Sequence, residues 1–334
     1  MARPLSLYGI SIASLPRKAQ LALLAVAMLS CHLLHGISTE HMARDVLGGL
    51  VWSAAAMELF LYAVFSGLEF FSSSEKRVWA EMPWRRYIII SLAIAVGRGL
   101  TWVALGQVTY PTVLLFKSSK IIVVMFSAML ILRKRFLPTE YAAALLAVTG
   151  LYTFSCADSM AGPRDESRQD SAHGVAVMLM AVGAEALVST MQEVCLRRLR
   201  RPLAELIFVS NGLGSVLLVG VSVLHGDLPV LHARLSESWQ LGTWVVMTVC
   251  LAYGGTYAFT SCIMGFGAVV ATGLGILRKM LSVLLSFALF PKPFGVAHMA
   301  GLAIFFSGLI VAWSTDWDKD KGVEGKAPAR DIES

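Results

Sequence analysis

The sequence predicts an all-α membrane protein of ten transmembrane helices, built as two inverted five-helix repeats with both termini in the cytoplasm. Hydrophobic residues make up 56% of the 334 residues and charged residues only 15%, which excludes an ordinary soluble domain. Apolar stretches of about 20 residues, the length that crosses a hydrocarbon core of about 30 Å, follow one another along the chain. A pattern shared by the two halves of the chain predicts the repeat.

Ten apolar stretches account for nearly all of the chain apart from short polar connections. Each is long enough to cross a bilayer as a helix, and the first lacks the small-residue cleavage site of a signal peptide. Their approximate ranges are 19–37, 49–71, 87–107, 111–132, 139–157, 174–194, 204–224, 241–262, 266–290 and 295–314.

The connections divide the chain into five parts. The stretch from Met160 to His173 is rich in Ser, Asp, Arg and Gly, a composition typical of a disordered connection. The predicted parts are a cytoplasmic tail (1–18), a first five-helix repeat (19–157), a lumenal hinge loop (158–173), a second five-helix repeat (174–314) and a second cytoplasmic tail (315–334).

Lysine and arginine predict the orientation, because cytoplasmic loops carry an excess of both. With the N-terminus in the cytoplasm, cytoplasmic segments hold eighteen of the 28 Lys and Arg residues and the opposite loops hold five. The remaining five lie within apolar stretches. The charge bias and the even number of helices agree, so both ends of the chain are expected to face the cytosol.

The second half of the chain repeats features of the first half at an offset of 158 residues. The matching pairs are Lys120 with Arg278, Lys134 with Lys292, Phe136 with Phe294, and Gly150 with Gly308. Because five helices is an odd number, duplication places the two halves in opposite membrane orientations. Such inverted repeats are typical of secondary transporters, whose substrate site lies near the bilayer midplane where the halves meet.

Five cations fall inside the apolar stretches: Arg98, Lys117, Lys120, Arg278 and Lys279. A charge at the bilayer centre costs about 3 kcal/mol on insertion scales, so such residues normally face a protein interior or an aqueous cavity. Lys117 and Lys120 are three residues apart and therefore share a helix face. Pseudo-twofold symmetry would bring Lys120 and Arg278 to opposite walls of one cavity, which predicts a binding site for a polyanion.

Two alternatives remain for these cations. They could instead pair with acids of the apolar stretches and hold the bundle together, and those acids are Glu58, Glu69, Glu185 and Glu193. Arg98 lies between Gly97 and Gly99 and has no partner in the repeat, so a buried structural role and a place on the substrate path are equally consistent with it.

Several segments resemble a known family. They are Tyr110-Pro111-Thr112, Phe116-Lys117 with Lys120, Gln192-Glu193, Phe266-Gly267-Ala268, Arg278-Lys279 and Lys292-Pro293-Phe294. Together they resemble the nucleotide-sugar transporters of the drug/metabolite transporter superfamily over about residues 85–315. Within these, they are most similar to the branch that carries adenosine 3'-phosphate 5'-phosphosulfate (PAPS).

The resemblance implies an antiporter of the Golgi membrane, with the endoplasmic reticulum as the alternative. Such a protein imports an activated nucleotide donor and returns the spent nucleotide. The segment Gly275 to Lys279 is similar to the Gly-Ala-Leu-Asn-Lys segment of GDP-mannose transporters, but Arg278 replaces the asparagine. A guanidinium adds a fixed charge and a planar fork suited to phosphate or sulfate, which disfavours GDP-mannose.

The resemblance also implies candidate residues for the nucleobase. Ser210 and Asn211 lie where GDP-mannose transporters carry Phe-Tyr-Asn-Asn, and an asparagine amide suits an adenine edge. Interhelical hydrogen bonding is the alternative role for Asn211. Tyr110 is expected either to stack on a base or to pack between helices.

Charge narrows the substrate, because PAPS carries roughly four negative charges and a nucleotide diphosphate sugar roughly two. PAPS is therefore favoured, with a UDP-sugar or ATP/ADP exchanger as the alternative and a non-nucleotide metabolite exporter as a further one. No phosphate-binding loop, catalytic motif, metal site or cofactor site is recognised, so no enzyme activity is expected. The expected partners are the nucleotide, the lipid bilayer and a second copy of the chain, but no nucleic acid.

Overall fold

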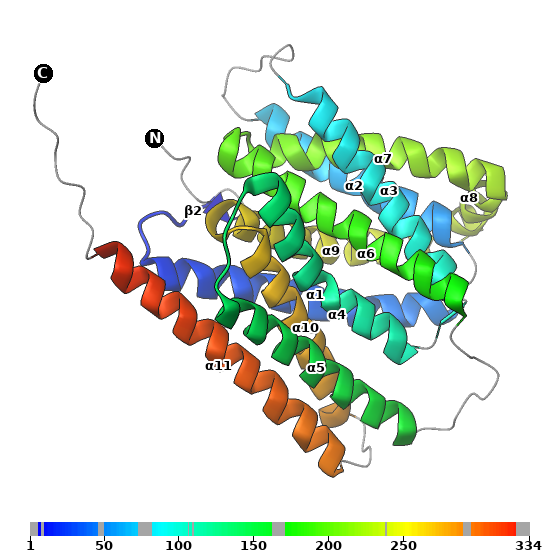
Figure 1. Cartoon of the computed structure of the whole chain (residues 1–334). Coiled ribbons are helices and arrows are strands. Elements are labelled where there is room, and N and C mark those ends of the chain that lie inside the picture. The colour runs from blue at the N-terminus through cyan, green and yellow to red at the C-terminus, as the bar shows by residue number, and fades with distance from the viewer. Residues whose placement is uncertain are drawn as a thin grey trace, which may run out of the picture.

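The computed structural model describes residues 6–7, 10–45, 50–72, 82–105, 107–108, 110–161, 171–237, 239–289 and 295–324. Two two-residue strands, β1 (Ser6–Leu7) and β2 (Ile10–Ser11), pair antiparallel ahead of the first helix. All other regular structure within these ranges is helical (Figure 1). The predicted all-helical class is therefore confirmed.

The helices begin and end close to the predicted apolar stretches. They are α1 (Arg17–Asp45), α2 (Val51–Ser72), α3 (Trp84–Leu105), α4 (Tyr110–Leu132), α5 (Pro138–Ala161), α6 (Ala172–Glu193) with a π-helical turn η2 (Val194–Arg198), α7 (Leu203–His225), α8 (Asp227–Glu237), α9 (Trp239–Phe266), α10 (Ala268–Leu289) and α11 (Val296–Glu324).

Six stretches in the described part of the chain are long and apolar enough to cross a membrane. They lie in α1, α2, α4, α6 with η2, α7 and α9, and α11 adds a shorter apolar stretch over 296–312. Large apolar side chains also cover the outer surface of the bundle. Among the most exposed are Val26, Phe60, Leu68, Leu130, Val216, Leu224 and Ile310. A surface of this kind suits contact with lipid and would be an aggregation hazard in water.

Helix α8 was not predicted, because its 11 residues are too short to cross a bilayer. It follows α7 directly, after Gly226 ends that helix in a left-handed conformation with φ of 76°. Glycine adopts this conformation without a Cβ clash, which lets the chain reverse. Leu231 is buried, and Leu235 packs against a cluster formed by α2, α7 and α9.

The long helices pack in pairs around two central ones. Helix α2 lies along α7, α5 along α11, α1 along α9, and α3 along α6, while α4 and α10 contact each other inside the bundle (Figure 1). Helices α5 and α11 approach closely at two glycines. A Cβ added at Gly308 would lie 2.8 Å from the Ala147 nitrogen, and one at Gly150 would lie 2.6 Å from Phe305 Cα. No side chain fits at either position.

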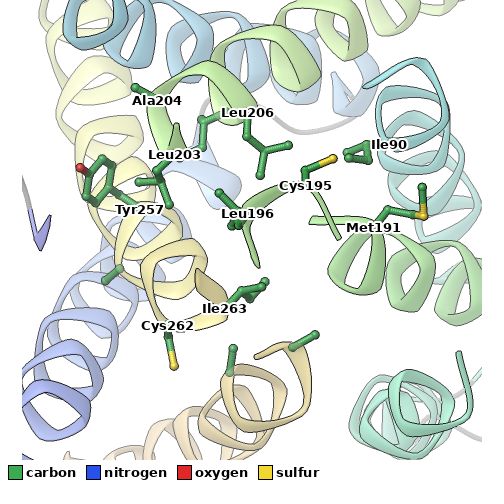
Figure 2. Packing of buried hydrophobic residues seen from close by; sticks show 14 of the residues in the cluster. Ile90, Met191, Cys195, Leu196, Leu203, Ala204, Leu206, Tyr257, Cys262 and Ile263 are labelled. Atoms are coloured by element: carbon green, nitrogen blue, oxygen red, sulfur yellow. The ribbon is translucent and has the colours of Figure 1, made fainter. Parts of the chain in front are cut away.

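The largest apolar cluster joins all the long helices except α5 and α11, and Figure 2 labels members of it from α3, α6, η2, α7 and α9. Cys195 and Cys262 belong to it, and all five cysteines are free. The cluster holds the C-terminal end of α6 against α7 and α9, and this end borders the cavity described below.

Candidate anion-binding site

A cavity of about 440 Å³ lies among α1, α3, α4, α6, α9 and α10. Its lining is polar at several points although the surrounding helices are strongly apolar. The lining residues are Met28, His32, Ile94, Arg98, Lys117, Lys120, Glu185, Val188, Ser189, Gln192, Thr256, Phe259, Thr260, Thr272, Gly275, Ile276, Arg278 and Lys279. This volume is within the range typical of small-molecule sites.

All five cations that the sequence places in apolar stretches line this one cavity. Arg98 comes from α3, Lys117 and Lys120 from α4, and Arg278 and Lys279 from α10. The structure thus brings together residues that are up to 181 positions apart in the chain. Burying like charges side by side is unfavourable in an apolar medium, so the arrangement is of the kind expected at an anion-binding site.

Arg98 is neutralised by a carboxylate. Its Nη1 and Nη2 atoms donate to Oε2 and Oε1 of Glu58 at 2.5 and 3.3 Å. The Tyr62 hydroxyl also donates to Glu58 Oε1 at 2.5 Å. Arg98 therefore has a structural partner even though it faces the cavity, and it adds little net charge to the lining.

Lys120 has a looser partner. Its Nζ lies 3.5 Å from Glu185 Oε2, and the Thr101 hydroxyl lies 3.5 Å from the other oxygen of that carboxylate. Gly97 makes room for this acid, because a Cβ there would lie 3.2 Å from Glu185 Cγ. Both charged side chains are partly exposed, at 20% and 31%. At 3.5 Å against 2.5 Å, this ion pair is looser than the Arg98–Glu58 pair.

The remaining three cations have no carboxylate within ion-pair distance in the described part of the chain. Lys279 Nζ donates to the backbone oxygen of Lys117 at 2.5 Å, which joins α10 to α4 without cancelling a charge. Five cations and the two acids Glu58 and Glu185 therefore leave three positive charges uncompensated among the described residues. Such a site suits a ligand with several negative charges.

Glu193, another of the four predicted cation partners, pairs with cations outside the cavity. It is 1% exposed and accepts from Lys134 Nζ at 2.5 Å, from Arg197 Nη1 at 3.0 Å and from the Ala268 backbone N–H at 3.0 Å. Gly267, with φ of 97°, packs over this carboxylate, because an added Cβ would lie 3.0 Å from Glu193 Oε1. We call this set of contacts the Glu193 junction. It joins the ends of α4, α6 and α10.

The structure places the predicted nucleobase residues elsewhere. Ser210 and Asn211 are buried in α7 and donate to the backbone oxygens of Leu206 and Ile207, and neither lines the cavity. The Asn211 bond stays within α7, so it is not the interhelical hydrogen bond expected as the alternative role for this residue. Tyr110 begins α4, but its side chain lies outside the described residues.

Sequence reasoning missed the neutral polar part of the lining. Gln192 and His32 line the cavity together with the hydroxyls of Ser189, Thr256, Thr260 and Thr272. Scattered polar residues in apolar helices usually bond to their own helix, so none stands out singly. The available signal is helical spacing, because Ser189 with Gln192 and Thr256 with Thr260 each share one helix face.

A family model described as the UAA transporter family matches residues 19–315. A Caenorhabditis elegans protein named adenosine 3'-phospho 5'-phosphosulfate transporter 2 is 29% identical, over 94% of this chain and 86% of its own. The human protein of that name is 26% identical over 80% of this chain and 66% of its own. An Arabidopsis thaliana protein named UDP-galactose/UDP-glucose transporter 4 is 25% identical over 93% of this chain and 88% of its own.

A solved crystal structure is similar in fold. It has a TM-score of 0.63 and 15% sequence identity, and the match covers 89% of this chain and 98% of the other. At this identity the likeness concerns the arrangement of the helices alone.

Proposed function

The chain belongs to the UAA transporter family, and from this premise we propose that it is an antiporter that carries PAPS into the Golgi lumen in exchange for the spent nucleotide. The family and the named relatives support a membrane transporter of the nucleotide-sugar type. We infer from the cavity and the family that the cargo is PAPS, that transport is by exchange and that the membrane is that of the Golgi.

The charge of the cavity carries the proposal. Lys117, Arg278 and Lys279 face it without carboxylate partners among the described residues, and Lys120 is only loosely held by Glu185. PAPS offers roughly four negative charges, whereas a UDP-sugar offers roughly two. A UDP-sugar would therefore leave at least one buried cation unmatched, at a cost in binding free energy.

A UDP-sugar exchanger remains the second candidate, because the Arabidopsis relative is named for UDP-galactose and UDP-glucose. ATP and ADP match PAPS in charge and fit the same cations. Arg278 favours sulfate or phosphate over a neutral sugar, since its planar guanidinium forms paired hydrogen bonds to two oxygens.

We propose that the fold consists of two inverted repeats, 19–157 and 174–314, each with five spanning helices. In this repeat α1 to α5 correspond, in order, to α6, α7, α9, α10 and α11. The helix contacts support the correspondence, because the α1–α9 contact then matches the α6–α3 contact. The contacts α2–α7, α4–α10 and α5–α11 each join a helix to its own counterpart. The contacts of Gly150 and Gly308 are reciprocal at the offset of 158. Gly150 faces Gly301 and Phe305, while Gly308 faces Ala143 and Ala147.

We propose that the end of the bundle with the basic loops faces the cytosol. The α4–α5 loop, the turn after η2 and the α9–α10 junction meet there, joined by the Glu193 junction and by a bond from Arg198 to the Leu132 oxygen. The start of α1 lies at this end too, where Arg17 stacks 5.7 Å from the Phe266 ring centre. In this arrangement the Glu193 junction lies at the cytosolic end of the bundle, next to the cavity residue Gln192, and we propose that it opens when substrate enters from that side.

Exchange follows from the same charges. Three uncompensated cations resist passage through a closed, apolar intermediate, so the empty carrier should reorient slowly and the loaded carrier quickly. Vesicles containing the purified protein and preloaded with adenosine 3',5'-bisphosphate should therefore take up labelled PAPS much faster than vesicles without nucleotide. Equal rates would refute obligatory exchange.

Substrate identity is tested by melting temperature, because a ligand that binds the native state stabilises it. PAPS should raise the melting temperature most, ATP less or equally, and UDP-galactose and UDP-N-acetylglucosamine little. Stabilisation by the uridine nucleotides alone would overturn the proposed cargo. Transport unaffected by both Lys120→Ala and Arg278→Ala would instead favour export of a non-nucleotide metabolite.

A further inference from the structure

The cavity has a charged end and a neutral polar end. The cations lie on α3, on α4 and in the middle of α10, whereas Gln192, Thr260 and Thr272 lie toward the Glu193 junction. The Ala268 N–H donates to the Glu193 carboxylate, so the C-terminal end of α6 lies beside the N-terminal end of α10. Gln192 and Thr272 therefore lie near one end of the cavity and Lys279 lies farther along it.

The two ends are separated by about the length of a nucleotide. Gln192 lies seven positions after Glu185 on α6, and Lys279 lies seven positions after Thr272 on α10. At a rise of about 1.5 Å per residue, each pair spans about 10 Å along the helix axis. When the phosphates contact the cations, the base of the same molecule reaches the neutral end.

Gln192 differs from the other polar groups at this end. The hydroxyls of Thr260 and Thr272 donate to the backbone oxygens of Thr256 and Ala268 at 2.8 and 2.7 Å. They can therefore offer a ligand only acceptor oxygens. The Gln192 amide has no hydrogen-bond partner among the described residues, so both its oxygen and its NH₂ group are available in the cavity.

An amide with a free oxygen and a free NH₂ group matches the edge of adenine, where an amino donor stands beside a ring-nitrogen acceptor. Met28, Val188 and Phe259 also line the cavity, and they offer apolar surface to the faces of a ring.

We propose that Gln192 is a specificity-determining residue that hydrogen-bonds the adenine of the transported nucleotide. This inference rests on the proposed function, since it assigns the base of the nucleotide whose phosphates the cations hold. It replaces the earlier expectation for Ser210 and Asn211, whose side chains bond within α7.

The proposal is tested by measuring the affinities of two ligands for the wild-type protein and for Gln192→Leu. The ligands are adenosine 3',5'-bisphosphate and its purine-riboside analogue, which lacks only the 6-amino group. The wild-type protein should bind adenosine 3',5'-bisphosphate between about fivefold and 150-fold more tightly than the analogue, the range of one paired amide–base contact. Gln192→Leu should bind the two ligands nearly equally.

Pyrophosphate, which has no base, separates the outcomes. Gln192→Leu should bind pyrophosphate as the wild type does, and Gln20→Leu, a change at an amide that bonds to Ala13 and Leu15 away from the cavity, should leave all three affinities unchanged. Retained discrimination in Gln192→Leu, or an equal loss for pyrophosphate, overturns the role of Gln192. A wild-type protein that binds no adenine nucleotide overturns the proposed function as well.

If Gln192→Leu does not fold, Gln192→Glu provides the same test with an isosteric side chain. It keeps an acceptor and loses both donors, so it should bind adenosine 3',5'-bisphosphate more weakly than pyrophosphate relative to the wild type. Equal weakening of both ligands would indicate only the added negative charge and would overturn the proposal.

Discussion

Replacing Glu185 by glutamine should strengthen nucleotide binding. Glu185 lies 3.5 Å from Lys120 Nζ and is the only carboxylate among the residues described as lining the cavity. Glutamine keeps the size of the side chain and its ability to contact the Thr101 hydroxyl, but it removes the negative charge that competes with a bound phosphate.

The magnitude follows from the geometry of this ion pair. Two unit charges at 3.5 Å attract by about 5 kcal/mol at an effective dielectric of 20 and by about 1 kcal/mol in water. Because the Lys120 and Glu185 side chains are 20% and 31% exposed, the value near water is the better guide. We therefore expect adenosine 3',5'-bisphosphate to bind about five- to tenfold more tightly to Glu185→Gln, and the gain to shrink at high salt.

Titration calorimetry of the purified variants measures this affinity directly. Glu69→Gln is the matched control, because Glu69 accepts from the Tyr257 hydroxyl at 2.9 Å and neither residue lines the cavity. It should leave nucleotide affinity within about twofold, since it removes a carboxylate that pairs with no cavity cation among the described residues. Weaker binding by Glu185→Gln would refute the idea that this carboxylate and the substrate compete for Lys120.

Three further predictions concern charge, packing and the Glu193 junction. Lys279→Ala removes both an uncompensated charge and the bond to the Lys117 backbone oxygen, so PAPS uptake by vesicles should fall at least about tenfold. A fall of about fivefold or less would argue against a place for Lys279 in the site. Gly150→Ala should destabilise the protein by about 1–3 kcal/mol, because the added methyl group meets the α11 backbone. Gly183→Ala is the control, since the space around Gly183 is open. Equal melting temperatures for the two variants would contradict the close contact of α5 with α11. Glu193→Gln should lower the melting temperature by several degrees, because Lys134 and Arg197 lose a shared counter-charge. The loss is about 1–2 kcal/mol, since these two side chains are 30% and 37% exposed. An unchanged melting temperature would mean that the Glu193 junction does not stabilise the fold.

The helical class and the residues that form the charged end of the cavity could be predicted because both depend on local composition. A chain with apolar stretches of spanning length must form helices in lipid, whatever their arrangement. A cation inside such a stretch is so costly that it must face a cavity or a partner, and Lys117, Lys120, Arg278 and Lys279 were identified on that ground alone.

The rotation of each helix about its axis was decided only by the tertiary structure. Helices that are apolar on all sides give no periodic signal for the face that turns inward. For this reason Gln192 and His32 were missed, and Ser210 and Asn211 were expected at a cavity that they do not line.

The pairing of charges was also beyond the sequence, because it depends on distances between different helices. The sequence supplied Glu58, Glu69, Glu185 and Glu193 as four equivalent candidates for pairing with the cations. The structure binds Glu58 tightly to Arg98, leaves Glu185 loosely beside Lys120, and turns Glu193 toward the basic loops. Composition thus determined that this chain is a helical membrane protein with buried cations. Packing decided which of those cations keep their charge available for a ligand, since Coulomb energy depends on separations that only the folded chain sets.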